Sequence, residues 1–348
     1  MIRHSRPSVD RSGAKKVSRV LLSGNHATGE TVGEFEKRLS SFVGVRGGVA
    51  TNSGTSALHA TLLALGVKAG DEVIMPSFVC TALINAVNYA GARPVLADVD
   101  EDNFNIDYKS VLARLTKKTK AVIIPHMFGL PVDIKPFLGL GIYIIEDCAQ
   151  SLGAEAGGKK TGSAGHAAIF SFYATKLIST GHGGMLTSNS KTILGRARDL
   201  LDFDERKNYK IRFNYHMTDF QAALGISQLD RLKEFIRKRI EKASYYDRRL
   251  YELPIKLPAK KTNIYYRYVI RVNKDAGAII SRLKRRGIEA KRPVFKPLHR
   301  YFGLEKRSFP AAERVFKEAI SLPIYPDLKD SDMQKTADTL INVFDNRL

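Results

Sequence analysis

The sequence feature that most constrains the fold is a series of short apolar runs, separated by longer stretches of helical character. Each run has the length of one buried strand. Strands of this kind alternate with helices in α/β folds, where helices cover both faces of a mostly parallel sheet. We therefore predict an α/β fold with a mostly parallel central sheet sandwiched by helices. The predicted strands span residues 72–75, 93–97, 121–125, 142–145, 167–172 and 184–187.

The pattern changes near residue 218, and the remainder resembles a smaller α+β domain. The length of 348 residues suits two domains. We predict a large domain over residues 1–235, which begins with a polar arm over residues 1–18, and a small C-terminal domain over residues 236–348. The elements predicted beyond residue 218 are one long amphipathic helix at 220–242, strands at 265–272 and from 288, and helices at 276–286, 310–320 and 332–344.

A glycine- and serine-rich segment over residues 48–55 precedes an apolar helix predicted at 57–65. We interpret this segment as a turn, with Gly54, Thr55 and Ser56 at the start of the helix. A helix N-terminus offers free backbone N–H groups and a positive dipole end, so it can bind phosphate, and glycine lets the backbone approach closely. The same residues also suit an ordinary N-cap, and both interpretations stay open.

A carboxylate follows the apolar pair Ile144-Ile145 at the end of a predicted strand, at Asp147. A buried acidic residue is costly unless it is paired or functional. In doubly wound sheets the carboxyl ends of strands face the ligand crevice, where an aspartate could pair with a protonated pyridine nitrogen. It could equally cap the following helix.

Lys176 lies just beyond another apolar run, and a glycine-rich turn over residues 181–184 follows it. A lysine in an enclosed apolar pocket becomes nucleophilic and can form a Schiff base, although most lysines are simply solvated. A phosphate-binding turn, a strand-end aspartate and a lysine follow in the order that a pyridoxal 5'-phosphate (PLP) enzyme requires. The aspartate would keep the pyridine nitrogen protonated, so that the ring can withdraw electrons.

These motifs resemble those of the DegT/StrS-type sugar aminotransferases, a branch of the fold type I PLP-dependent transferases. The resemblance runs from about Val20 to the C-terminus. It implies an enzyme that transfers an amino group, from glutamate, to a nucleotide-diphosphate-linked keto-sugar, with C4 preferred over C3 as the amination position. The matching segments are residues 52–58, 70–74, 146–150, 171–176, 214–223, 297–299 and 322–326.

The resemblance also implies a role for each matching residue. Lys176 would hold the cofactor and move the proton, and Asp147 would pair with the ring nitrogen. Asn214 would reach the cofactor phosphate of a neighbouring subunit, which makes a homodimer with shared active sites the catalytic unit. The remaining cofactor-binding residues would be Gly54, Thr55 and Ser56, the Ser171 hydroxyl at the phosphate, Gln150 near the ring and its phenolic oxygen, and Cys80.

Some positions depart from the family pattern. Cys80 stands where many members carry an aromatic residue stacked on the cofactor, so stacking would come from elsewhere, with Phe78 as one candidate. His182 and His216 replace a common glutamate and a common arginine. Because of these changes, the resemblance does not assign the residues that contact the substrate and the donor. His126 matches a family histidine, for which a structural hydrogen bond is as good an interpretation as catalysis.

Two alternatives share the fold. A PLP-dependent sugar dehydratase would carry histidine in place of Lys176, and an iron–sulfur cluster would need four thiolates where this chain has two cysteines. A non-catalytic regulator that binds PLP or nucleic acid would not need the lysine–aspartate–glutamine set. Cys80 and Cys148 lack disulfide or metal-ligand spacing, and we expect both to be small core residues.

The net charge of +21 favours anionic partners. The most basic segment, residues 282–300, has no zinc-finger or RNP-type motif and no interleaved aromatic residues, so nucleic acid is a minor alternative. Lys291, Arg292 or Lys296 in this segment could bind a substrate diphosphate. No apolar run reaches the roughly 18 residues of a membrane span, and the N-terminus is polar. We expect a cytoplasmic protein without a membrane partner.

Overall fold

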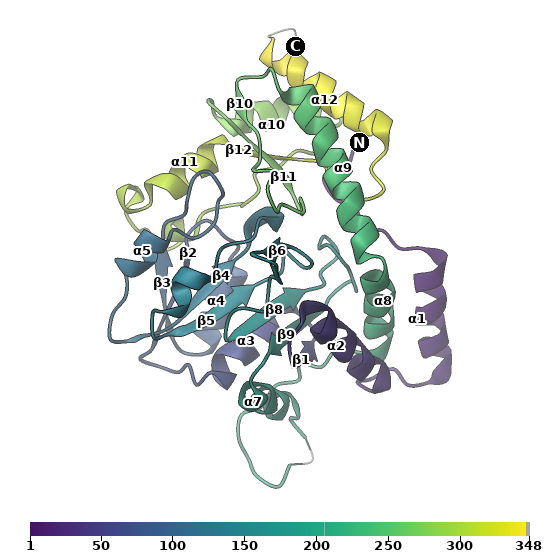
Figure 1. The fold of residues 1–348 in the computed structure, drawn as a ribbon, viewed down its shortest axis with the longest axis vertical. Coiled ribbons are helices and arrows are strands. Elements are labelled where there is room, and N and C mark those ends of the chain that lie inside the picture. The colour runs from purple at the N-terminus through teal and green to yellow at the C-terminus, as the bar shows by residue number, and fades with distance from the viewer. Residues whose placement is uncertain (205, 346–348) are drawn as a thin grey trace.

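The computed structural model describes residues 1–204 and 206–345, and it is built around a seven-stranded sheet (Figure 1). The strand order is β1-β9-β8-β5-β4-β2-β3. Only β9 runs antiparallel to its neighbours within this sheet, as the described pairings show, so the predicted mostly parallel sheet is confirmed. The strands are β1 (Gly47–Thr51), β2 (Glu72–Pro76), β3 (Arg93–Ala97), β4 (Thr119–Pro125), β5 (Tyr143–Asp147), β8 (Ala167–Ser171) and β9 (Gly184–Ser188).

Helices bury both faces of this sheet. Successive side chains of a strand point to opposite faces, so Val73 and Met75 of β2 enter one core while Ile74 enters the other. Both faces are apolar, which is why the strands appear in the sequence as continuous apolar runs. The covering helices are α2 (Glu30–Val43), α3 (Gly54–Ala64), α4 (Ala82–Tyr89), α5 (Tyr108–Leu112), α6 (Lys135–Leu138), α7 (Lys191–Leu201) and α8 (Asp219–Asp230).

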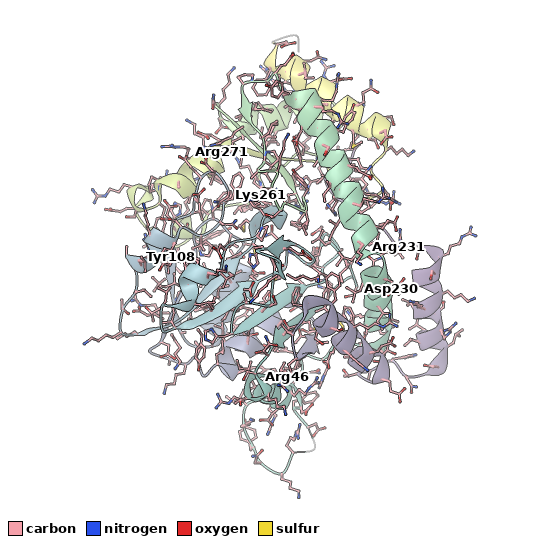
Figure 2. All side chains as sticks on the ribbon, in the orientation of Figure 1. Arg46, Tyr108, Asp230, Arg231, Lys261 and Arg271 are labelled. Atoms are coloured by element: carbon pink, nitrogen blue, oxygen red, sulfur yellow. The ribbon has the colours of Figure 1, made fainter. Side chains whose placement is uncertain are left out.

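Two elements near this sheet differ from the sequence prediction. The start of the predicted turn is the strand β1, whose residues pair with β9. The single predicted helix over residues 220–242 is two helices, α8 and α9 (Leu232–Leu250), which break at Arg231 (Figure 2). Arg231 has φ −98° and ψ 0°, outside the geometry of a continuous helix.

The C-terminal part has a sheet and a core of its own. The antiparallel sheet consists of β10 (Ile255–Lys256), β11 (Tyr268–Val272) and β12 (Ala319–Leu322). Its buried residues pack against α9, α10 (Ala276–Arg285) and α12 (Asp330–Phe344). The strand predicted from residue 288 is only a pair of isolated bridges, and the helix predicted at 310–320 is α11 (Pro310–Glu318), after which β12 begins. The boundary at residue 235 stays a prediction.

The N-terminal residues link the two parts of the chain. The predicted arm is in part a helix, α1 (Arg11–Ser23), which packs on α8. Before it, Ile2 bridges to Ile288, and its N–H donates to the Gly287 carbonyl oxygen. Across residues 1–204 and 206–345, no helix has the length and apolar character needed to cross a membrane. The remaining elements are the 3₁₀ turns η1 (Met127–Gly129), η2 (Leu298–Arg300) and η3 (Lys306–Ser308), and the hairpin β6 (Glu155–Ala156) and β7 (Lys159–Lys160).

Candidate active site

A cavity of about 380 Å³ brings together residues from all three predicted motifs. It lies where β5 and β8 end and α3 begins. A larger groove of about 950 Å³, between α9 and the segment 260–265, contains none of the predicted site residues. The smaller cavity is lined by Ser53, Gly54, Thr55, Leu58, Cys80, Ala82, Leu83, Asp147, Ala149, Ile169, Ser171, Tyr173, Lys176, His182 and Gly183.

The N-terminus of α3 forms one end of the cavity. The Ser53 hydroxyl caps the helix by accepting a hydrogen bond from the Ser56 N–H at 3.1 Å. Among the described residues, the N–H groups of Gly54 and Thr55 have no acceptor, as expected at a helix start. A Cβ on Gly54 would lie 2.9 Å from the Ser171 Cβ, so glycine allows Ser171 to approach the helix end. These free N–H groups and the Ser171 hydroxyl suit a phosphate.

Asp147 lies at the carboxyl end of β5 and is 7% exposed. Its Oδ1 accepts a hydrogen bond from the Ala149 N–H at 2.9 Å, and no other described donor binds the carboxylate. Burial raises the pKa of Asp147 above its usual value, although the Ala149 bond and the Lys176 ammonium oppose the shift. A protonated ring nitrogen in the cavity would supply the partner that this carboxylate lacks. The residues present therefore fit PLP, with Asp147 for the nitrogen, Lys176 for the aldehyde, and the start of α3 for the phosphate.

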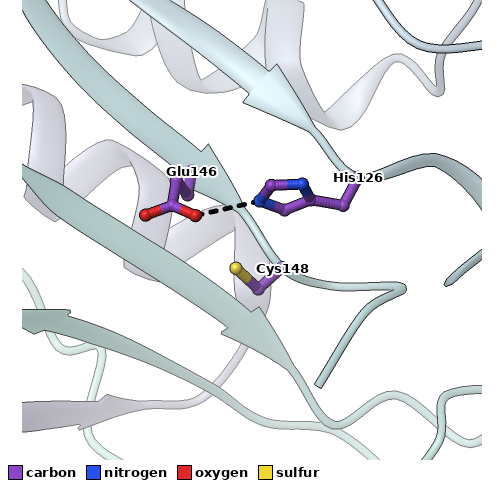
Figure 3. A group of neighbouring side chains, drawn as sticks. All are labelled: His126, Glu146 and Cys148. Atoms are coloured by element: carbon purple, nitrogen blue, oxygen red, sulfur yellow. Dashed lines mark hydrogen bonds and ion pairs between the residues drawn. The ribbon is translucent and has the colours of Figure 1, made fainter. Parts of the chain in front are cut away.

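Beneath Asp147, the side chains of His126, Glu146 and Cys148 form a buried cluster whose ligand atoms lie within 4.8 Å of one another (Figure 3). The His126 Nδ1 accepts a hydrogen bond from the Val132 N–H, so its Nε2 carries the proton that it donates to Glu146 at 3.0 Å. Burial raises the pKa of Cys148, which keeps it a thiol. Both His126 nitrogens and both Glu146 oxygens make hydrogen bonds within the protein, which favours a structural role for the cluster. Glu146 also accepts hydrogen bonds from the N–H groups of Gly162, Ala164 and Gly165.

Sequence reasoning missed one residue beside the lysine, Tyr266. The Lys176 Nζ lies 5.3 Å from the centre of the Tyr266 ring. Tyr266 comes from the segment just before β11, which pairs with η1: the Ile264 N–H donates to the Gly129 carbonyl at 3.1 Å. Gly129 has φ 96°, and a Cβ there would lie 2.8 Å from the Tyr266 nitrogen. The sequence signal was the tyrosine-rich run 265–268, which we interpreted only as the start of a strand.

The Tyr266 phenol is surrounded by cations. Burial alone would raise its pKa, but the charges of Lys176 and Arg267, with a hydrogen bond to Thr175, outweigh burial and lower the pKa of Tyr266 to about 8. The Arg267 guanidinium lies 4.8 Å from the centre of the same ring. The Tyr266 ring therefore lies between two cations, of which Lys176 lines the cavity.

Gln150 and Asn214, two further predicted site residues, make hydrogen bonds that do not test their predicted roles. The Gln150 Oε1 accepts a hydrogen bond from the Phe128 N–H at 3.0 Å, and this bond fixes η1 beside the site. The Asn214 carbonyl accepts a bond from the Asn52 side chain at 3.3 Å, while Asn214 itself is exposed and lies outside the cavity.

The aromatic and cysteine expectations need correction. Cys148 is buried as predicted, but Cys80 is exposed at the cavity. Phe78 is fully buried and stacks on Phe104, so it does not reach the cavity. Tyr173 is the aromatic residue in the lining, and its ring contacts that of His182.

The basic residues predicted to bind a diphosphate have other partners. Lys291 pairs with Glu289 at 2.8 Å, and Arg292 pairs with Asp275 at 3.2 Å. The Lys296 ammonium lies 4.4 Å from the centre of the Tyr301 ring. None of the three lines the cavity.

A mostly parallel sheet, a helix N-terminus, a strand-end aspartate and a lysine around one cavity define the class of PLP-dependent transferases with the aspartate aminotransferase fold. The sequence profile of the DegT/DnrJ/EryC1/StrS aminotransferase family matches residues 7–341. The chain belongs to this family.

Individual relatives agree with this assignment. The GDP-perosamine synthase of Caulobacter vibrioides is 35% identical over 338 residues, which cover 91% of each protein. The Streptococcus pneumoniae protein described as "putative sugar aminotransferase Spr1654", solved in its PMP form, superposes with a TM-score of 0.94 at 28% identity, over 99% of this chain and 98% of that one. Helicobacter pylori PseC, an aminotransferase of pseudoaminic acid biosynthesis, superposes with a TM-score of 0.92 at 27% identity, over 99% of both chains.

The chain is therefore an aminotransferase, and its cofactor is PLP, since Spr1654 is known in both a PLP form and a PMP form. The chain is a sugar aminotransferase of this family.

Proposed function

We propose that this enzyme transfers an amino group from glutamate to a nucleotide-diphosphate-linked keto-sugar, at C4 in preference to C3, in amino-sugar biosynthesis. The observation that carries the proposal is the 35% identity to a protein named GDP-perosamine synthase, over nearly the whole chain. The cavity supports it, because Lys176, Asp147 and the start of α3 meet there. The net charge of +21 suits a substrate with a diphosphate and a donor with two carboxylates.

The residues of the cavity divide the chemistry between them. PLP, when bound, withdraws electrons from the carbon that carries the amino group. The Lys176 amine moves the proton as general base and then as general acid. The Asp147 carboxylate balances the charge of the ring nitrogen, and the Gly54 and Thr55 N–H groups hold the phosphate together with the Ser171 hydroxyl. Because both half-reactions use one lysine, donor and acceptor occupy the same cavity in turn.

The dimer is part of the proposal. Asn214 is exposed and follows a long loop that leads away from α7, at the bottom of Figure 1. Its carbonyl lies beside Asn52, next to the start of α3. A side chain at the edge of the phosphate site that makes no contact with it in its own subunit is well placed to serve the site of a partner.

The experiment is a panel of nucleotide keto-sugars offered to the purified enzyme with glutamate, with the products identified by mass spectrometry. An aminated nucleotide sugar, with 2-oxoglutarate in equal amount, supports the proposal. The Lys176→Ala variant is the control, and borohydride should attach the cofactor to Lys176 in the wild type alone. Loss of water from the sugar without gain of nitrogen would instead identify a dehydratase, and salt-sensitive DNA binding without turnover would identify a regulator.

A further inference from the structure

A separate cavity lies where the N-terminal residues meet α12 (Figure 1). Its volume is about 340 Å³, at the lower end of the range for small-molecule sites. The side chains that line it include those of Arg3, Arg6, Tyr325, Asp332 and Lys335. None of its lining residues lines the active-site cavity, so the two cavities are distinct.

Three basic side chains and one acidic side chain line this cavity. Arg3 and Arg6 come from the N-terminal segment, and Lys335 comes from the second turn of α12. None of the three forms an ion pair with another residue in the described part of the chain. Asp332 is the acidic residue, so the side chains of the lining carry a net charge of +2. A concave surface with unpaired cations of this kind attracts an anion.

The backbone around Arg3 is held in place by its neighbours. The Glu289 N–H donates to the Ile2 carbonyl oxygen at 2.9 Å, and the His4 N–H donates to the Glu289 carboxylate at 2.9 Å. Ile2 and His4 are both buried. The Glu289 carboxylate is another acid near Arg3, but it already pairs with Lys291 at 2.8 Å. Arg3 therefore extends from an ordered segment and keeps its charge for a ligand.

The Tyr325 hydroxyl is an unsatisfied polar group in this cavity. Tyr325 is 7% exposed, and its hydroxyl has no hydrogen-bond partner among the residues that the structure describes. Burial, followed by the charge of Asp332, raises the pKa of Tyr325, while the charges of Arg6 and Arg3 oppose the shift. The phenol therefore keeps its proton and can donate it. Buried hydroxyls normally have a partner, and a ligand in the cavity would supply one.

We propose that this cavity binds a phosphate dianion, as the free ion or as the monoester of a small molecule. A phosphate monoester carries about two negative charges near neutral pH, which matches the net charge of the lining. Arginine and lysine bind phosphate through charge-assisted hydrogen bonds, and the Tyr325 hydroxyl adds a neutral donor. The inference goes beyond the proposed reaction, because the cavity shares no lining residue with the site around Lys176.

Asp332 distinguishes the two forms of the ligand. Its carboxylate repels a phosphate group, so it weakens the binding of the free ion. The same carboxylate can accept a hydrogen bond from a hydroxyl group on the body of an ester. A sugar phosphate offers such hydroxyl groups, whereas inorganic phosphate has only its own oxygen atoms.

The test uses the holoenzyme with its cofactor fixed to Lys176 by borohydride, so that the phosphate position of the active site is already filled. Inorganic phosphate and glucose 1-phosphate are titrated by calorimetry, with the ionic strength held constant by sodium chloride. We expect saturable binding of one ligand per subunit. Tighter binding of glucose 1-phosphate identifies the ligand as a monoester, and equal affinity identifies it as the free ion.

Variants of the charged residues test the site itself. Arg6→Gln and Lys335→Gln should each raise the dissociation constant for phosphate about 10-fold, the effect of one charge-assisted hydrogen bond. Asp332→Asn should lower the constant, because it removes the repelling carboxylate. The matched control is Lys317→Gln, which removes the same charge from an exposed position of α11 outside the cavity and should bind phosphate as the wild type does.

Tyr325→Phe separates a ligand contact from a structural role. Because the hydroxyl has no partner to lose in the described part of the chain, the ligand-free variant should unfold at the same temperature as the wild type. Its dissociation constant for phosphate should rise about 3- to 10-fold, the range of one neutral hydrogen bond. A lower unfolding temperature with unchanged phosphate affinity would assign the hydroxyl to the fold and contradict the inference.

Two further results would overturn the inference. One is phosphate binding that does not saturate, or heat that sodium chloride alone reproduces at equal ionic strength. The other is equal phosphate affinity in the wild type, Arg6→Gln and Lys335→Gln. Neither result bears on the transfer of an amino group, which is measured separately with glutamate and keto-sugars.

Discussion

At the scale of single residues, the buried Asp147 carboxylate has fewer hydrogen-bond donors around it than a charged acceptor needs. Burial raises its pKa, and only the Ala149 N–H hydrogen-bonds to it among the described residues. We predict that Asp147→Asn, which keeps the shape and removes the charge, lowers the turnover rate by about 10- to 100-fold, the range for one hydrogen bond to a charged group. Steady-state kinetics at saturating PLP measure the effect. Equal turnover in the two proteins would remove Asp147 from the mechanism.

Tyr266 gives a prediction for pH. Its pKa is about 8 in the fold and 10.0 ordinarily, so the phenol is neutral below about pH 8 and charged above it. Ionisation therefore stabilises the folded state increasingly as the pH rises from about 8 towards 10, and the phenolate adds a negative charge beside Lys176 that repels a carboxylate donor. Glutamate should bind less tightly as the pH rises through 8.

The control for this prediction is Tyr266→Phe, which retains the ring and cannot ionise. Its glutamate dependence should stay flat through pH 8. Absorption of tyrosinate in the cofactor-free protein should show one early step in the wild type that the variant lacks. If both proteins titrate alike, another group is responsible for the pH effect.

Sequence reasoning identified the site residues that stand beside an apolar run, and it missed those that reach the site only through tertiary contacts. Lys176 and Asp147 were predicted because each stands beside an apolar run in a recognisable order. Tyr266 and Arg267 come from a segment 90 residues beyond Lys176. Only the pairing of that segment with Phe128 and Gly129 brings Tyr266 beside Lys176, and such tertiary pairing leaves no local pattern.

At the scale of elements, a close approach of two backbones shapes the phosphate site. A Cβ at Gly184 of β9 would collide with the Ser53 carbonyl, just before α3. We predict that Gly184→Ala pushes α3 away, costs about 1–3 kcal/mol of stability and weakens PLP binding. Thermal unfolding and PLP titration measure the two effects.

The matched control is Gly195→Ala in α7. An added Cβ there meets nothing within 4 Å, and the position is an exposed helix interior. Alanine should therefore stabilise the protein by about 0.5–1 kcal/mol and leave PLP affinity unchanged. If the two variants behaved alike, the proposed contact between β9 and α3 would have no energetic role.

The fold prediction was most accurate for the strands that are buried on both faces. Strands β2 to β5 were predicted within two residues at either end, because both their faces are apolar. β1 was missed because it begins with Gly47 and Gly48, and glycine carries no strand signal. The break at Arg231 was missed because the apolar periodicity continues across it. Residues 288–291 have a strand-like sequence, but they form only isolated bridges, to Ile2 and Ser321.

At the scale of the whole molecule, the active site depends on segments far apart in the chain. Residues of α3, β5 and β8 meet at the cavity, and Tyr266, which lies beside Lys176, comes from the segment before β11. Asn214 is exposed and does not line the cavity of its own subunit. The proposed homodimer with shared sites would account for it, because a symmetric pair would give each cavity one Asn214 from its partner.

The shared site can be tested by mixing two inactive variants. Lys176→Ala and Asn214→Ala should each abolish most activity, because every site in either homodimer carries the lesion. In the mixed dimer both lesions fall on one site and the other is intact. Random exchange of subunits should therefore restore about a quarter of the wild-type activity. Two variants of the same cavity, Lys176→Ala and Asp147→Asn, provide the contrast: if both act within one subunit, each mixed site keeps one lesion and no activity returns. Failure of the first pair to complement, with subunit exchange shown by mass spectrometry, would place Asn214 in its own subunit.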